Sequence, residues 1–260
     1  MKPNYKEFAI NLAQMSGEIM RKNFTLGMNK EWKSDNSPLT VTDKAINNLV
    51  IKEVNTLFPD HSVVAEEGSS IVKESDYTWV CDPIDGTFPF SHGYPCFVFS
   101  LALTYKGKSI LGVIYDPIMD RMFFAQSGKG TYLNGAKTRV SNNKIIQNTV
   151  LDSVTWSGAK YELFPVFNLI SKSGGHPATI LSICYSSSLV ACGEFSASIY
   201  PDTKPWDAAA VKIIVEEAGG IVTDLFGNDQ HYDKSINGFI ASNGYVHNQL
   251  LKLIKSSLSQ

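Results

Sequence analysis

The sequence contains no apolar run long enough to cross a membrane. Its longest apolar stretches, residues 97–103 and 110–115, are far shorter than the ~20 residues that a membrane-spanning helix requires. The opening residues MKPN lead into an amphipathic pattern, which differs from the continuous apolar core of a signal peptide. We therefore expect a cytoplasmic protein that contacts no membrane.

Patterns of cysteine and histidine that bind zinc are also missing. The four cysteines form no Cys-x-x-Cys motif, and the five histidines form no His-x-x-x-His pair. This argues against a zinc site and against a disulfide framework. The formal net charge is −2, so no positive field indicates a nucleic-acid partner.

The residues that are present predict an α+β protein. Helical spacing of apolar side chains predicts helices over residues 4–23 and about 42–57, the second capped by Thr40 or Thr42. Strand-like runs separated by hairpin turns predict an antiparallel meander from about residue 97 to 140. Strands and helices then alternate. We expect an N-terminal α+β lobe (1–143) with most of the metal ligands, packed tightly against a C-terminal α/β lobe (144–260).

Carboxylates stand at the ends of several predicted apolar elements. Asp43 ends LTVTD, Glu66 lies in VVAEEG, Asp82 and Asp85 lie in WVCDPIDGT, and Asp207 lies in KPWDAAAV. A ligand set of oxygen atoms alone favours Mg²⁺, for which Mn²⁺ can substitute. This many carboxylates indicates more than one ion, and paired Mg²⁺ ions are typical of phosphoryl chemistry.

Each acidic motif also has a purely structural interpretation. Asp43 and Asp207 are residues that commonly cap helices, and Glu66 suits a solvated turn. The pair Asp82 and Asp85 is more specific, because two buried carboxylates are costly without a counter-ion. The Gly-Thr that follows this pair allows close backbone approach, and a helix starting there would offer free N–H groups to a phosphate.

The DGT triplet also occurs in phosphatases that use Asp-x-Asp-Gly-Thr with the first aspartate as a covalent nucleophile. In this sequence Pro83 stands at the nucleophile position. Proline cannot attack phosphorus, so a covalent aspartyl-phosphate mechanism is excluded.

Three motifs in order, AEEG, WVCDPIDGT and PWDAAAVKIIVEEAGGIVTD, resemble the inositol monophosphatase family. The resemblance covers about residues 5–250. It implies a five-layer α-β-α-β-α sandwich, with a larger antiparallel sheet in the N-terminal lobe and a smaller mixed sheet in the C-terminal lobe, in a homodimer. It also implies a Mg²⁺-dependent, lithium-sensitive phosphatase of small phosphomonoesters, using two or three ions.

The resemblance assigns roles residue by residue. The implied metal ligands are Glu66, Asp82, the backbone carbonyl of Ile84, Asp85 and Asp207. Thr87 and Asp43, with Glu66, form the catalytic group in which Thr87 orients the attacking water. The residues implied on the substrate side are Gly86, Thr87, Ser182, Tyr200 and Asp207.

The substrate side departs from the family pattern. Tyr200 occupies the position of an inositol-contacting glutamate, and LSIC (residues 181–184) replaces Gly-Ser-Ala-Ala. Tyr200 suits a substrate contact or a core aromatic. The sequence therefore leaves the small phosphorylated metabolite open among inositol-1-phosphate-like, fructose-1,6-bisphosphate-like, histidinol-phosphate-like and 3′(2′),5′-bisphosphate-nucleotide-like compounds.

Two further alternatives remain at this stage. The substituted substrate side is compatible with a catalytically silent, metal-binding dimeric regulator. The polar loop at residues 27–38, which carries Lys30, Trp32 and Lys33, is either a mobile lid or an ordinary solvated loop.

Overall fold

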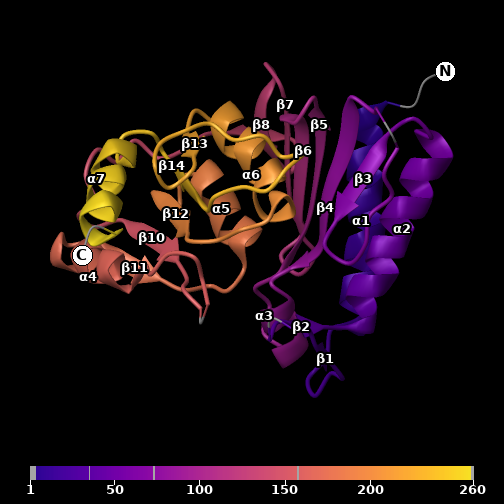
Figure 1. Cartoon of the computed structure of the whole chain (residues 1–260), viewed down its shortest axis with the longest axis horizontal. Helices are drawn as coiled ribbons and strands as arrows, with labels where there is room; N and C mark the ends of the chain where they lie inside the picture. The colour runs from indigo at the N-terminus through magenta and orange to yellow at the C-terminus, as the bar shows by residue number, and fades with distance from the viewer. Residues whose placement is uncertain (1–3, 35, 73, 157, 259–260) are drawn as a thin grey trace.

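The computed structural model describes residues 4–34, 36–72, 74–156 and 158–258. Its elements stack in five layers of alternating helices and sheets, seen edge-on in Figure 1. This confirms the predicted α-β-α-β-α architecture. None of the helices in these ranges is both long enough and apolar enough to cross a membrane.

The first layer consists of α1 (Tyr5–Asn23) and α2 (Val41–Leu57), as the helical spacing predicted. Asn4 caps α1, because its side chain accepts a hydrogen bond from the Lys6 N–H. Thr40 and Asp43 form a capping box at the start of α2. The buried faces of both helices pack on a seven-stranded sheet and enclose one apolar core with it.

The seven-stranded sheet has the order β3-β4-β5-β6-β7-β8-β9. Its strands are β3 (Ser62–Ala65), β4 (Tyr77–Asp85), β5 (Val98–Tyr105), β6 (Lys108–Asp116), β7 (Arg121–Gln126), β8 (Gly130–Leu133) and β9 (Ala136–Thr138). Strands β4 to β9 are antiparallel, which confirms the predicted meander, whereas β3 pairs with β4 in parallel. The larger sheet, which the family resemblance implied to be antiparallel, is therefore mixed at this one edge.

The middle layer consists of α5 (Ile183–Ala191) and α6 (Pro205–Glu217). Helix α6 contacts β5 and β6 on one side and β13 and β14 on the other, so it belongs to the core of both sheets. Its small buried residues Ala208, Ala209 and Ala210 allow this close double packing.

The five-stranded sheet has the order β11-β10-β12-β14-β13 and is mixed, as predicted. Its strands are β10 (Val150–Ser153), β11 (His176–Ala178), β12 (Ala197–Tyr200), β13 (Ile221–Thr223) and β14 (Phe239–Ser242). The outer layer of α4 (Phe164–Lys172) and α7 (His247–Leu258) covers it and encloses a third apolar core.

Two short elements connect these layers near the acidic motifs. Strands β1 (Glu31–Trp32) and β2 (Pro38–Leu39) form a small hairpin inside the loop that the sequence predicted as a lid or a solvated segment. Helix α3 (Thr87–His92) follows β4 directly, after Gly86. Both lie at the lower end of the seven-stranded sheet in Figure 1.

Candidate active site

Asp82 and Asp85 lie at the end of β4, where the strand contains a β-bulge. Asp82 pairs with Ser100 and Asp85 pairs with Val98, so two residues of β4 lie opposite one residue of β5. Residues three apart in a regular strand point to opposite faces of the sheet, and the extra residue of the bulge returns both aspartates to one face. Pro83 suits the bulge because it has no N–H to donate to the neighbouring strand.

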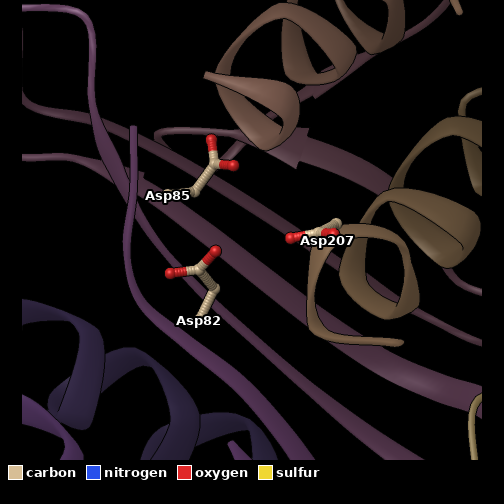
Figure 2. A group of neighbouring side chains, drawn as sticks. All are labelled: Asp82, Asp85 and Asp207. Carbon is tan, nitrogen blue, oxygen red and sulfur yellow. The ribbon is translucent and has the colours of Figure 1, made fainter. Parts of the chain in front are cut away.

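Asp207 adds a third carboxylate from α6. It is the third residue of the helix, and its Oδ2 accepts a hydrogen bond of 2.6 Å from the Lys204 N–H. One oxygen from each of Asp82, Asp85 and Asp207 lies within 4.8 Å of the others. Figure 2 shows the three carboxylates around one shared space. Asp207 is thus both a helix-capping residue and a member of this group.

The environment of these carboxylates favours a cation. Burial raises the pKa of Asp82 well above its ordinary value, and the nearby Glu66 carboxylate raises it further. Burial also raises the pKa of Asp207. Burial raises the pKa of Asp85 to about 6, although hydrogen bonds to its carboxylate, above all the one from Ser182, lower it in part. A divalent cation would relieve this cost, and a set of carboxylate oxygens suits Mg²⁺. The residues present therefore fit the metal.

These pKa shifts predict how pH affects the stability of the chelated protein. The pKa of Asp85 rises from 3.8 to about 6, and that of Glu66 rises from 4.5 to about 7. The folded state therefore binds protons more tightly than the unfolded state, so stability should fall as pH increases from about 4 to 7. Urea unfolding in EDTA across this range measures the slope. Saturating Mg²⁺ should reverse it, because the ion binds the deprotonated carboxylates. A slope that is positive in EDTA would contradict the prediction.

Asp85 is fixed by the first turn of α5. Its Oδ1 accepts a hydrogen bond of 3.0 Å from the Ile183 N–H, and its Oδ2 accepts one of 2.8 Å from the Cys184 N–H. The Ser182 hydroxyl donates a further hydrogen bond to Oδ2. Ser182, which the family resemblance placed on the substrate side, thus has its hydroxyl bonded to an acidic residue of the site. The free N–H groups of a helix N-terminus stabilise negative charge.

Thr87 and Asp43 lie side by side, as the resemblance implied. Thr87 Oγ1 lies 3.1 Å from Asp43 Oδ1 and 3.0 Å from the Ile84 carbonyl oxygen. The other carboxylate oxygen of Asp43 accepts hydrogen bonds from the N–H and hydroxyl of Thr40, at 2.8 and 2.5 Å. Burial raises the pKa of Asp43 to about 6. Gly86 positions Thr87 with a φ of 91°, and a Cβ there would lie 2.7 Å from the Cys96 carbonyl oxygen.

Glu66 lies outside the group of three carboxylates and is bound by Lys33. Lys33 comes from the β1–β2 hairpin region, and its Nζ donates a hydrogen bond of 2.7 Å to Glu66 and another to Glu67. Burial alone would lower the pKa of the Lys33 ammonium, but the two glutamates raise it above its ordinary value. The sequence had placed Lys33 in the loop without assigning it this contact.

Replacing Lys33 by glutamine should destabilise the chelated protein. The change removes the positive charge that binds both Glu66 and Glu67 and offsets their mutual repulsion. Charged hydrogen bonds of this kind contribute about 1.5–3 kcal/mol to stability. We expect a lower midpoint of urea unfolding in EDTA and a smaller difference in saturating Mg²⁺. The matched control is Lys44→Gln, which breaks the exposed pair with Glu31 and should change stability little. Equal effects of the two substitutions would contradict the prediction.

The family model described as "Inositol monophosphatase family" matches residues 2–259. This chain belongs to the inositol monophosphatase family. The "Fructose-1,6-bisphosphatase/inositol-1-monophosphatase" of Thermotoga maritima is 31% identical over 98% of this chain and 97% of its own. The "Nus factor SuhB" of Pasteurella multocida is 32% identical over 96% of both chains.

Solved structures of inositol monophosphatases have the same fold. The Thermotoga maritima IMPase covers 97% of both chains with a TM-score of 0.88 at 30% identity. An IMPase/NADP phosphatase complexed with Mg²⁺ and phosphate covers 95% of this chain and 93% of its own, with a TM-score of 0.82 at 26% identity. Metal dependence is a property of the family, and the acidic group of this chain is consistent with it.

Tyr200 departs from the role that the inositol monophosphatase pattern implied for its position. Its side chain is 1% exposed and packs on Phe239. Its hydroxyl donates a hydrogen bond of 2.5 Å to Asp152 and lies within hydrogen-bond distance of Ser186. This places Tyr200 as a core aromatic, the second of its two interpretations, and a direct substrate contact has no support here.

Two further residues lie next to the site and were not predicted from the sequence. Asp152 is a fully buried carboxylate in β10, and a charged residue inside the apolar run TVLDSV is a signal that could have marked it. Leu181 has a φ of 62°, a conformation that favours glycine, and the replacement of a family glycine was the available sign.

Proposed function

We propose that this inositol-monophosphatase-family phosphatase hydrolyses a small sugar, polyol or nucleotide phosphate by direct attack of water, with Mg²⁺ as cofactor. The observation that carries the proposal is the contact between Thr87, two residues after Asp85, and Asp43 at the start of α2, beside a strand end where carboxylates converge. A site that only bound metal would not need a hydroxyl joined to a buried carboxylate.

The metal ligands that we propose are Glu66, Asp82, Ile84 through its carbonyl, Asp85 and Asp207. Two or three Mg²⁺ ions, or Mn²⁺ ions in their place, would neutralise these carboxylates, polarise the phosphate and lower the pKa of water. Binding of an ion to Glu66 would compete with the Lys33 ammonium, which holds the same carboxylate.

The Thr87 hydroxyl supports the proton transfer. Its two neighbours, Asp43 Oδ1 and the Ile84 carbonyl oxygen, both accept hydrogen bonds, so its own proton points toward one of them. When that proton points to Asp43, the Thr87 oxygen can accept a hydrogen bond from water and orient the water toward phosphorus. As the water oxygen bonds to phosphorus and the P–O ester bond breaks, the proton of the water passes to Thr87 and the Thr87 proton passes to Asp43. Asp43, with a pKa raised to about 6 by burial, can receive the proton near neutral pH.

The phosphate group would lie against the N–H groups of Gly86 and Thr87, at the start of α3. Gly86 allows this approach because it carries no side chain. Within this class, a fructose-1,6-bisphosphate and a 3′(2′),5′-bisphosphate nucleotide are the alternative substrates to an inositol-1-phosphate-like compound. The double name of the Thermotoga maritima relative supports including the first of them.

A catalytically silent metal-binding regulator is the second candidate function. It is favoured by the similarity to a protein named as a Nus factor. Retention of both Thr87 and Asp43 in contact favours the phosphatase instead.

The test removes bound metal from the purified protein with EDTA, restores Mg²⁺ and measures phosphate release from a panel of phosphorylated compounds. The panel contains inositol 1-phosphate, fructose 1,6-bisphosphate, histidinol phosphate, 3′-phosphoadenosine 5′-phosphate and NADP. We expect turnover that requires Mg²⁺ on at least one compound. Normal Mg²⁺ binding with no turnover on any compound would support the regulator and overturn the phosphatase.

Three further measurements check the remaining proposals. Lithium added to the active reaction checks the proposed lithium sensitivity. Light scattering checks the proposed homodimer, and fractionation of the source cell checks the proposed cytoplasmic location.

A further inference from the structure

Asp152 is a buried carboxylate that the proposed chemistry does not use. It lies in β10 with 0% of its surface exposed. Its Oδ1 accepts a hydrogen bond of 2.9 Å from the Ile180 N–H, and its Oδ2 accepts one of 2.5 Å from the Tyr200 hydroxyl. A charge in a buried strand is costly, and an apolar side chain would fill β10 at lower cost. Its presence therefore calls for a role.

The two oxygens of Asp152 hold both sides of one strained turn. Ile180 precedes Leu181, the residue with a φ of 62°. Tyr200 lies within hydrogen-bond distance of Ser186, in the first turns of α5, after Leu181. A bulky residue in this conformation is strained and persists only where its surroundings enforce it. The Asp152 contacts supply that constraint.

The opposite side of the same turn holds Asp85. The N–H groups that bind the Asp85 carboxylate belong to Ile183 and Cys184, two and three residues after Leu181. Any rotation of the turn would move these donors relative to both oxygens of Asp85. The route from Asp152 to Asp85 thus consists of one turn with a hydrogen-bonded carboxylate on each side.

We propose that Asp152 and Tyr200 are positioning residues that fix the first turn of α5 and thereby orient Asp85 toward its cation. The substrate does not need to touch either of them. The inference rests on the proposed function for its activity and Mg²⁺ readouts, whereas amide exchange in EDTA measures the order of the turn without either.

The first experiment compares Tyr200→Phe with Ser187→Ala. The first change removes only the hydroxyl that joins Asp152 and Ser186 and keeps the ring on Phe239. Ser187 is the matched control, because it is a buried hydroxyl one residue further along α5. It bonds the Ile183 carbonyl and Ser198, which lies opposite Asp152 in the sheet, but it bonds neither oxygen of Asp152 and does not contact the Tyr200 hydroxyl.

Two measurements are made on each variant as a full chain. Hydrogen exchange of the amides of residues 180–186 is followed in EDTA, and Mg²⁺ affinity is measured by calorimetry. We expect Tyr200→Phe to increase exchange at these amides about tenfold. Mg²⁺ binding should weaken by about tenfold, the lower end of the effect of losing a direct outer partner of a metal ligand, because Tyr200 acts on Asp85 only through the turn. Ser187→Ala should change neither by more than about twofold.

Asp152→Asn is the second variant, and it keeps the size and the acceptor for the Ile180 N–H. We expect Asp152→Asn to increase amide exchange and to weaken Mg²⁺ binding, both by less than Tyr200→Phe does. On any active substrate, kcat should fall by a larger factor than KM changes. Unchanged exchange and Mg²⁺ affinity in both variants, with folding shown by circular dichroism, would overturn the positioning role. Equal losses in Ser187→Ala would overturn it as well. If the wild type binds Mg²⁺ through Asp85 but hydrolyses nothing, the proposed function fails and the positioning role is still decided by the two measurements.

Discussion

Replacing Asp85 by asparagine is expected to lower the rate of Mg²⁺-dependent phosphate release by about three orders of magnitude or more, equivalent to about 4 kcal/mol of transition-state stabilisation. The substitution removes one of three charges whose oxygens converge within 4.8 Å. It also sets an amide NH₂ against the N–H group of either Ile183 or Cys184, which now donate to separate oxygens of the carboxylate. Steady-state assays at saturating Mg²⁺ measure the loss.

The matched control for this change is Asp224→Asn. The Asp224 carboxylate also accepts backbone hydrogen bonds, from Phe226 and Asn228, in a turn outside the acidic group. We expect the activity of Asp224→Asn to stay within about twofold of the wild type, since Asp224 touches neither the metal ligands nor the substrate side. Turnover of Asp85→Asn close to that of this control would disprove the proposed mechanism.

The second large effect is expected from Thr87→Val. Valine keeps the shape of threonine but removes the hydroxyl that contacts Asp43. Because positioned proton transfer contributes about 10²–10⁴-fold, we expect kcat to fall by at least about a hundredfold with Mg²⁺ affinity nearly unchanged. A lower kcat with an unchanged Mg²⁺ affinity would show that the variant has lost the orientation of the attacking water and has kept its metal.

Two variants make this prediction specific. Thr87→Ser keeps the hydroxyl and should retain activity within about tenfold. Thr104→Val removes another buried threonine hydroxyl, which donates to the Thr78 carbonyl inside the sheet, and should leave kcat unchanged. A Thr87→Val enzyme with normal kcat would show that the hydroxyl does not take part in the reaction.

The fold followed from the sequence where local patterns repeat. Helices α1 and α2 were predicted within about two residues, because several turns of apolar spacing and a capping threonine all indicate the same element. The meander followed from its hairpin turns. Predictions were less accurate where the signal is short, and the β1–β2 hairpin was missed. The division into lobes at residue 143 stays a prediction.

The candidate site followed from the sequence only in its chemistry. Acidic residues in a chain without Cys-x-x-Cys or His-x-x-x-His motifs favour a hard cation wherever the chain places them. The position of Tyr200 could not be settled in this way, because its partner Asp152 lies 48 residues earlier in the sequence. The contact of Lys33 with Glu66 spans 33 residues and likewise leaves no local pattern.

The sequence by itself determined the longer elements, the family and the kind of ligand, since each depends on residue types and spacings within a short stretch of chain. The tertiary structure alone decided which side chains meet. A bulge turns Asp82 and Asp85 to one face, and α6 brings Asp207 to them. The start of α5 reaches Asp85 from about a hundred residues away. Such meetings depend on how helices and sheets pack, and packing is a property of the whole chain rather than of any segment.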